Sequence, residues 1–212
     1  MTEVMEKISN IGFAVKKVNV HISAVLLTAL FFVTGDGVLF GALIFAAMLH
    51  EIGHLIAIKI AGVKIKSVNI TAIGASIETD GFSSYRKDMA ISFAGPFVNL
   101  LAFSFAYAVY ASMGNVTADS FLSVFCGINL ILFTLNLIPV LPLDGGVVLR
   151  SYLMLKYERD YAHKLMFYIS LCSAVTLFAL GCVCFYHTKF NISVMLIALF
   201  LIFNVSRYEK IA

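Results

Sequence analysis

Charged residues are scarce in this sequence. Only 13% of its 212 residues are Asp, Glu, Lys or Arg, whereas 61% are hydrophobic and the mean hydropathy is +0.96. This balance excludes an ordinary soluble domain and indicates an integral membrane protein. No tract rich in Lys and Arg is present, so nucleic acid is not an expected partner. Residues 1–17 are polar and of mixed charge, so we expect no cleavable signal peptide.

Cysteine is also sparse, and its spacing excludes two common roles. The four cysteines lie in apolar runs and none has the C-x-x-C spacing of a zinc or redox site. We expect small buried side chains and no disulfide framework. No internal repeat or low-complexity segment is evident. The sequence therefore predicts a single membrane-embedded domain over residues 1–212.

Long apolar runs occur from one end of the chain to the other. A spanning helix needs about 20 apolar residues. The predicted spans are Val18–Thr34, Val38–Ala61, Met89–Met113, Phe121–Ile138, Leu165–Tyr186 and Phe190–Val205. The expected fold class is an all-α polytopic membrane protein with six transmembrane helices and a short β-hairpin-like segment after the second span.

The basic residues predict the orientation. With six spans and a cytoplasmic N-terminus, every Lys and Arg except Lys189 falls on the cytoplasmic side, as the positive-inside rule requires. Both termini are then cytoplasmic. Of the two long cytoplasmic segments, Val63–Phe82 has β-branched residues that predict short strands or a hairpin. Pro139–Lys164 begins with PVLPLDGG, whose prolines and glycines end the fourth span, and we expect a loop there.

Two histidines and a glutamate lie inside the second predicted span, in the sequence HEIGH (50–54). Ionisable side chains within a membrane are rare unless they have a function. His50 and His54 are four residues apart, so on a helix they share a face and can bind one metal ion. Glu51 can reach a water on that metal, and zinc suits two imidazoles. The alternative is an accidental match in which the histidines only pack.

A catalytic zinc site usually has a third protein ligand. His50 lies twelve residues beyond Val38, or ~18 Å along the helix, in the inner half of the bilayer. The fourth span also runs inward and breaks at Pro139, which brings Asp144 to the same side. Asp144 is therefore the candidate third ligand, and the alternative is an ordinary Asp-Gly turn.

These residues resemble the paired motifs of the site-2 protease family of intramembrane zinc metalloproteases, H-E-x-x-H and N-x-x-P-x-x-x-L-D-G. The second motif is matched by Asn136, Pro139, Leu143, Asp144 and Gly145. The segment AGPFVN (94–99) resembles a further family element, and the resemblance covers roughly residues 18–205. It implies one Zn²⁺ per chain on His50, His54 and Asp144, with Glu51 as the catalytic general base. The implied reaction is hydrolysis of a peptide bond in a membrane-associated protein near the cytoplasmic face.

Substrate contacts are expected in three places. The resemblance puts Asn136 near the site beside Pro139. The edge of a strand within Ile70–Glu78, including Ile73 and Gly74, is a candidate for β-augmentation by substrate, and the alternative is a hairpin that only packs on the helices. Asn99 is a candidate for substrate gating in the AGPFVN segment. Its alternative is a role in joining helices, with Gly95 and Pro96 allowing close approach and a kink.

Within the family the sequence is most similar to the stage IV sporulation protein FB group, on VNVHIS, LHEIGH, NLIPVLPLDGG and the six-span layout. That likeness implies an inactive sigma factor precursor (pro-sigma-K-like) as substrate, in the mother-cell membrane that surrounds the forespore. It also implies membrane proteins that inhibit the protease or present its substrate. We expect this chain to lack the C-terminal CBS domain of the group and the PDZ insertion of other relatives.

Two other functions compete with proteolysis. Some divalent metal transporters place H-E-x-x-H on a membrane helix, but the remaining spans here are poor in the carboxylates that a transport path needs. A non-catalytic homologue of the same fold is the second alternative, and it has no need of Glu51.

Overall fold

The computed structural model describes residues 18–20, 37–71, 74–79, 84–113, 120–188 and 193–209. Six helices and three strands lie in these ranges. The helices are α3 (Gly37–Ala61), α4 (Tyr85–Ser112), α5 (Phe121–Asn136), α6 (Asp144–Lys156), α7 (Arg159–Thr188) and α8 (Ser193–Glu209). The strands are β1 (Val18–Val20), β2 (Ile65–Thr71) and β3 (Gly74–Thr79).

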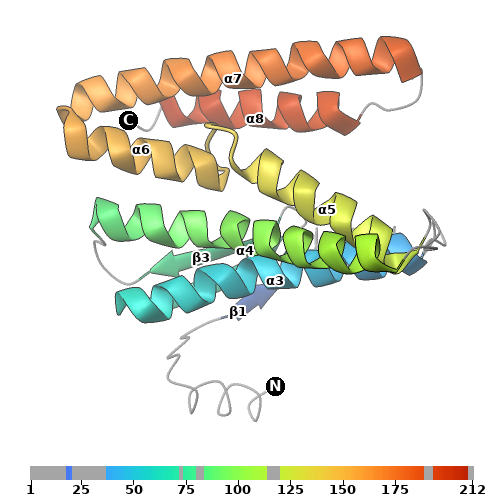
Figure 1. Ribbon diagram of the computed structural model, residues 1–212. Helices are drawn as coiled ribbons and strands as arrows, with labels where there is room; N and C mark the ends of the chain where they lie inside the picture. Colours follow the sequence, from blue (N-terminus) through green and yellow to red (C-terminus); the bar gives the residue numbers. More distant parts are fainter. Residues whose placement is uncertain are drawn as a thin grey trace.

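The helices form two groups joined by α5 and α6 (Figure 1). On one side α3 packs against α4, and α5 packs against both. On the other side α7 and α8 lie side by side as an antiparallel pair. Between them α6 packs against α4 and α7. This arrangement brings the first residue of α6 to the helices that contain the HEIGH segment.

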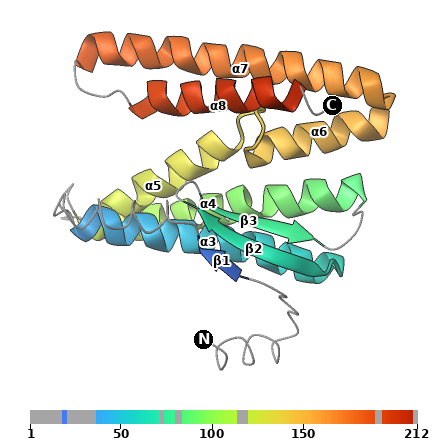
Figure 2. The same ribbon diagram turned by 180° about the vertical axis from the view of Figure 1, so that it is seen from behind.

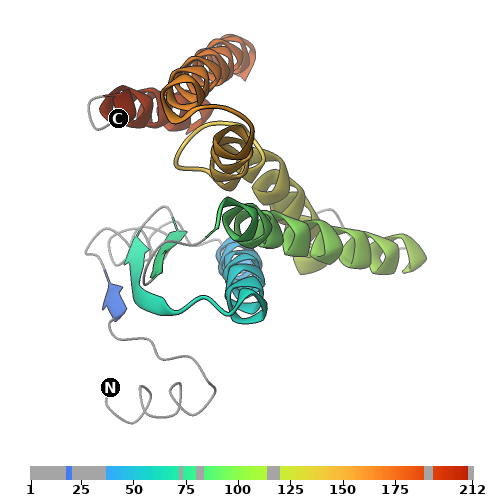
Figure 3. The ribbon, with the colours of Figure 1, turned by 90° about the vertical axis from the view of Figure 1, so that its left-hand side faces the viewer.

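A three-stranded sheet lies beside α3 (Figures 2 and 3). The strand order is β1-β2-β3. Strand β1 is parallel to β2, and β2 is antiparallel to β3. The strands β2 and β3 lie in the segment whose β-branched residues predict strands. Helix α3 ends before them at Gly62, whose φ of 66° places it in the left-handed region. The bonds from Val63 N–H to Ile58 and from Gly62 N–H to Lys59 make this a Schellman ending.

Small side chains allow close packing among α3, α4 and α5. Ala42 and Ala46 of α3 are fully buried, as is nearly all of Ala106 of α4, and they contact Phe125 and neighbouring residues of α5. Alanines at helix crossings let backbones approach, which is how membrane helices gain van der Waals contact. A second cluster contains Val140, from the α5–α6 connection, with residues of α7 and α8. The segment between α5 and Asp144 is therefore fixed against the C-terminal helix pair.

Among the described helices, α3, α4 and α7 are long and apolar enough to cross a membrane, and α5 and α8 are shorter apolar helices. The protein is a membrane protein on this evidence and on its composition. The predicted start of the first span was wrong, because Val18–Val20 forms strand β1 against Val68–Ile70. Its two β-branched residues favour an extended chain. The rest of that predicted span lies outside the described residues.

The expected loop at Pro139–Lys164 was also wrong. Within it only residues 139–143 and 157–158 are irregular, and α6 begins directly at Asp144. An acidic residue in the first turn is favourable beside the positive end of the helix dipole, and Asp144 supplies it. At 13 residues, α6 is about 20 Å long, too short to cross a bilayer.

Candidate metal centre

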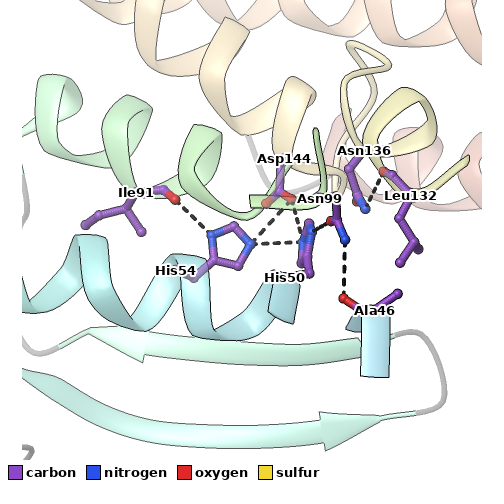
Figure 4. Close-up of polar contacts among 8 residues, drawn as sticks. All are labelled: Ala46, His50, His54, Ile91, Asn99, Leu132, Asn136 and Asp144. Atoms are coloured by element: carbon purple, nitrogen blue, oxygen red, sulfur yellow. Dashed lines mark hydrogen bonds and ion pairs between the residues drawn. The ribbon is translucent and has the colours of Figure 1, made fainter. Parts of the chain in front are cut away.

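His50 and His54 lie on one face of α3, as their spacing predicts. Their Nε2 atoms are 3.1 Å apart and their rings stand at 85° to each other. His50 is 8% exposed, and His54 is partly buried. The two imidazoles therefore face the same point inside the helix assembly (Figure 4).

Asp144 faces the same point from the first residue of α6. Its Oδ2 atom is 3.1 Å from His50 Nε2 and 3.4 Å from His54 Nε2. The adjacent Gly145 explains how the carboxylate comes so close. A Cβ atom at position 145 would overlap the backbone of Leu137, including its Cα at 2.8 Å. The absence of a side chain lets α6 begin directly against the end of α5.

The three ligand atoms have the spacing of a tetrahedral zinc site. Zn–N and Zn–O bonds of about 2.0–2.1 Å at tetrahedral angles separate neighbouring ligand atoms by about 3.3 Å. The observed separations are 3.1, 3.1 and 3.4 Å. Among the described His, Cys, Asp and Glu residues, His50, His54 and Asp144 form the group whose atoms cluster closely enough to hold a metal ion. Two imidazoles and one carboxylate therefore fit zinc in both chemistry and geometry.

Hydrogen bonds on the far side of each ring fix its tautomer. The Nδ1–H of His54 donates to the carbonyl oxygen of Ile91 at 2.8 Å. The Nδ1–H of His50 donates to the amide oxygen of Asn99 at 2.5 Å. Because each ring keeps a proton on Nδ1 for this bond, Nε2 is the atom that can give up its proton and bind a metal ion. A neutral imidazole held in this way is ready to bind a metal ion.

Helix α4 contacts both histidines through a glycine. A Cβ atom at Gly95 would overlap His54 Nε2 and would lie 2.6 Å from His54 Cε1 and 2.8 Å from His50 Cε1. Across the same interface, a Cβ at Gly53 would lie 2.7 Å from the carbonyl oxygen of Ala94. The two glycines let α3 and α4 approach so closely that the α4 backbone forms one wall of the site.

The charge of Asp144 suits a metal ligand. This residue lies outside the helices that are candidates to span the membrane. Burial raises the pKa of its carboxyl group, but the contacts with His50 and His54 outweigh burial and hold that pKa below its ordinary value. The carboxyl group is therefore ionised at neutral pH, the form in which carboxylates bind metals.

Glu51 follows His50 on α3, and its Oε2 atom is shielded from solvent. The residue before it, His50, carries one of the two imidazoles that face Asp144. This position is consistent with the general-base role implied by the family resemblance.

The expected substrate-binding residues lie on different elements of the fold. Asn136 is the last residue of α5, and its side chain donates to Leu132 O of its own helix at 3.0 Å (Figure 4). Pro139 lies in the connection to α6, where its carbonyl oxygen accepts a 3.4 Å bond from Ser170. Gly74 is the first residue of β3. Ile73 lies outside the described residues.

Asn99 has a more specific position. It is 0% exposed, accepts from His50, and donates to Ala46 O at 3.2 Å and to Asn129 Oδ1 at 2.8 Å. These contacts favour support of the site over direct contact with substrate. Asn129 was not anticipated from the sequence. The available signal was a second amide in the middle of an apolar helix, since such groups need a partner in a membrane.

Comparisons with known proteins agree with the geometry of the site. Residues 111–177 match the sequence model of Peptidase family M50. The chain is 28% identical over 196 residues to stage IV sporulation protein FB of Bacillus subtilis, which covers 92% of this chain and 66% of that protein. It is 29% identical over 175 residues to a zinc metalloprotease of Methanocaldococcus jannaschii, covering 82% of this chain and 50% of that protein.

A solved structure is similar over most of the fold. The site-2 protease from Methanocaldococcus jannaschii aligns with a TM-score of 0.66 and 26% identity, covering 90% of this chain and 89% of that one. The M50 match includes Asp144, and the structural likeness extends over nearly all of the chain. The chain is therefore similar to peptidase family M50 in sequence over residues 111–177 and to a site-2 protease in fold over most of its length. It spans less than two thirds of the length of the two curated relatives.

Proposed function

We propose that this protein is a zinc-dependent intramembrane endopeptidase. The observation that carries the proposal is the convergence of His50 Nε2, His54 Nε2 and Asp144 Oδ2 within 3.4 Å, with Glu51 next to the first ligand. When bound, zinc would lower the pKa of a coordinated water toward about 7 and polarise a peptide carbonyl group.

The side chains of the site divide the remaining tasks. Glu51 accepts the proton of the attacking water and then gives it to the departing amine nitrogen, the exchange expected of a general base and acid. His50 and His54 keep their Nδ1 protons, which they donate to Asn99 Oδ1 and Ile91 O, so they hold the metal and take no part in proton transfer. The negative charge of Asp144 offsets part of the charge of the dication.

An extended substrate strand is proposed to bind beside β3. In the order β1-β2-β3, only one side of β3 is paired within the described part of the chain. A peptide added to its other side would present its backbone in the extended form that hydrolysis requires, since an intact helix hides its peptide bonds. Gly74 begins this strand, and Asn136 and Pro139 are proposed to contact the substrate nearer the metal.

The topology is proposed to have six spans with both termini in the cytoplasm. Three described helices are long enough to cross a bilayer and two shorter ones are apolar. The distribution of Lys and Arg in the sequence supports this orientation. Asp144 then lies near the cytoplasmic face, where water can reach the site.

The proposed substrate is a membrane-associated protein, specifically an inactive sigma factor precursor of the pro-sigma-K type. The likeness to stage IV sporulation protein FB supports this choice. By the same likeness, membrane proteins that inhibit the enzyme or present its substrate are proposed as partners in a mother-cell membrane.

Glu51→Gln tests the activity. The full chain and a sigma factor precursor are co-expressed, and the shortened product and the zinc content of the purified protease are measured. Losing a general base typically costs 10²–10⁴-fold in rate, so we expect product to disappear while zinc content is unchanged. Glu158→Gln makes the same chemical change at an exposed position and should cleave like the wild type. Full cleavage by zinc-loaded Glu51→Gln would refute the proposal.

A further inference from the structure

Two fully buried amides extend from the metal centre into the interface of α3, α4 and α5. They belong to Asn99 and Asn129, both 0% exposed, and are called the asparagine pair below. Placing uncharged polar groups in an apolar interior is costly unless they are hydrogen-bonded. Neither amide takes part in the hydrolysis proposed above, so their bonds to each other and to His50 need their own explanation.

Main-chain carbonyl groups fix the direction of these bonds, because a carbonyl oxygen can only accept. Phe125 O accepts from Asn129 Nδ2 at 2.8 Å, which leaves Asn129 Oδ1 facing Asn99. Ala46 O accepts from Asn99 Nδ2 at 3.2 Å, and the same nitrogen donates to Asn129 Oδ1. Both hydrogens of the Asn99 amide are then used, and its oxygen faces His50.

The orientation of the Asn99 amide decides the tautomer of His50. An amide oxygen can only accept, so His50 must carry its proton on Nδ1, and Nε2 keeps a lone pair for the metal. If the amide were reversed, its nitrogen would donate to Nδ1. The proton of the neutral ring would then be on Nε2, where it blocks metal binding.

The two histidines differ in what supports them. The acceptor for His54 is the carbonyl oxygen of Ile91 within helix α4, which cannot reverse. The acceptor for His50 is a side-chain amide, which can. His50 alone of the two therefore depends on further groups to keep its acceptor in the correct orientation. These groups are Ala46 O and Asn129 Oδ1, which both accept from Asn99 Nδ2, and Asn129 is the one that makes its bond through a side chain.

We infer that Asn129 is a positioning residue for the metal ligand His50 and acts through Asn99. This inference rests on the proposed function in that it takes Zn²⁺ as the ligand of the site. A role of the asparagine pair only in joining α4 to α5 would destabilise variants without changing how tightly the folded protein binds zinc. Zinc affinity therefore separates the two roles.

The test measures zinc affinity of the purified full chain in detergent by competition with a chelator. All variants carry Glu51→Gln, so the result does not depend on peptide hydrolysis. Removing a residue that orients a metal ligand typically costs 10–100-fold in affinity. We expect a loss in this range for Asn99→Leu and a loss toward its lower end for Asn129→Leu. The visible absorption spectrum of the Co²⁺-substituted protein should change in both, because the His50 ligand is altered.

Two further variants complete the test. At this fully buried position the carboxyl group of Asn129→Asp is expected to be protonated. Its O–H can donate to Phe125 O while its other oxygen accepts from Asn99, so this variant should restore zinc affinity and the cobalt spectrum. Asn204→Leu removes a similar bond, from Asn204 Nδ2 to Phe200 O at 2.8 Å on α8, and should bind zinc like the parent. The inference is overturned if Asn129→Leu binds zinc as tightly as Asn204→Leu, or if Asn129→Asp is as weak as Asn129→Leu.

The outcome is independent of the test of the activity. Weak zinc binding in Asn129→Leu together with full cleavage by the Glu51→Gln protein would keep the positioning role and reject the proposed catalysis. Unchanged zinc binding in Asn129→Leu together with loss of cleavage in Glu51→Gln would do the reverse.

Discussion

Adding one methyl group at Gly95 should disrupt metal binding without disrupting the fold. The Cβ atom of Gly95→Ala would lie 2.6 Å from His54 Cε1, whereas ordinary contacts begin at 3.4 Å. The helices or the ring must therefore move by at least 0.8 Å, the difference of those two distances, because His54 Nε2 lies closer still to the added atom. Metal–ligand distances tolerate deviations of only about 0.2 Å. A movement of α4 would also displace Ile91 and Asn99, the acceptors for both histidines.

We expect Gly95→Ala to lower zinc affinity by at least 10–100-fold, the usual cost of disturbing the residues around a metal site. The assay is chelator competition on the purified protein, with thermal unfolding of the metal-free form measured in parallel. Gly127→Ala is the matched control, because no atom outside its own helix lies within 4 Å of the added Cβ. Both variants gain the same helix propensity, about 0.8–1.0 kcal/mol. Equal zinc affinity of the two would refute the close-packing argument.

Three other predictions follow from the placement of the elements. Gly145→Ala should lower zinc affinity in the same assay, because its Cβ overlaps the backbone of Leu137 and must displace Asp144; unchanged affinity would contradict this. Ile77→Pro removes a backbone N–H from β3 and should reduce cleavage at unchanged zinc content, whereas unchanged cleavage with an intact fold would reject substrate addition to that strand. A reporter enzyme fused to the C-terminus should show its activity on the cytoplasmic side of the membrane. Reporter activity on the outer side would disprove the six-span orientation.

The three candidate metal ligands could be predicted from the sequence, because the two histidines follow a helical spacing and the aspartate follows from the predicted topology. His50 and His54 follow from the period of an α-helix. Asp144 follows from the direction of two predicted spans and the helix break at Pro139. The structure places all three atoms within 3.4 Å of one another, so both kinds of reasoning led to the same site.

Contacts between distant elements could not be predicted in this way. The pairing of Val18–Val20 with Val68–Ile70 joins residues 50 positions apart, for example Val18 and Val68, and nothing in a three-residue segment specifies its partner. The sequence does not predict helix α6, because the prolines and glycines of PVLPLDGG disfavour a helix. In fact Gly145 and Gly146 lie in the first turn of α6, where they permit close packing against residues 137–141.

The position of α4 predicts that the site will tolerate little change. None of the three metal ligands comes from α4, yet this helix packs against α3, α5 and α6. Over Ile91–Asn99 it supplies the acceptor for each histidine and the glycine that both rings contact. A shift of α4 therefore changes the orientation and the spacing of the imidazoles together.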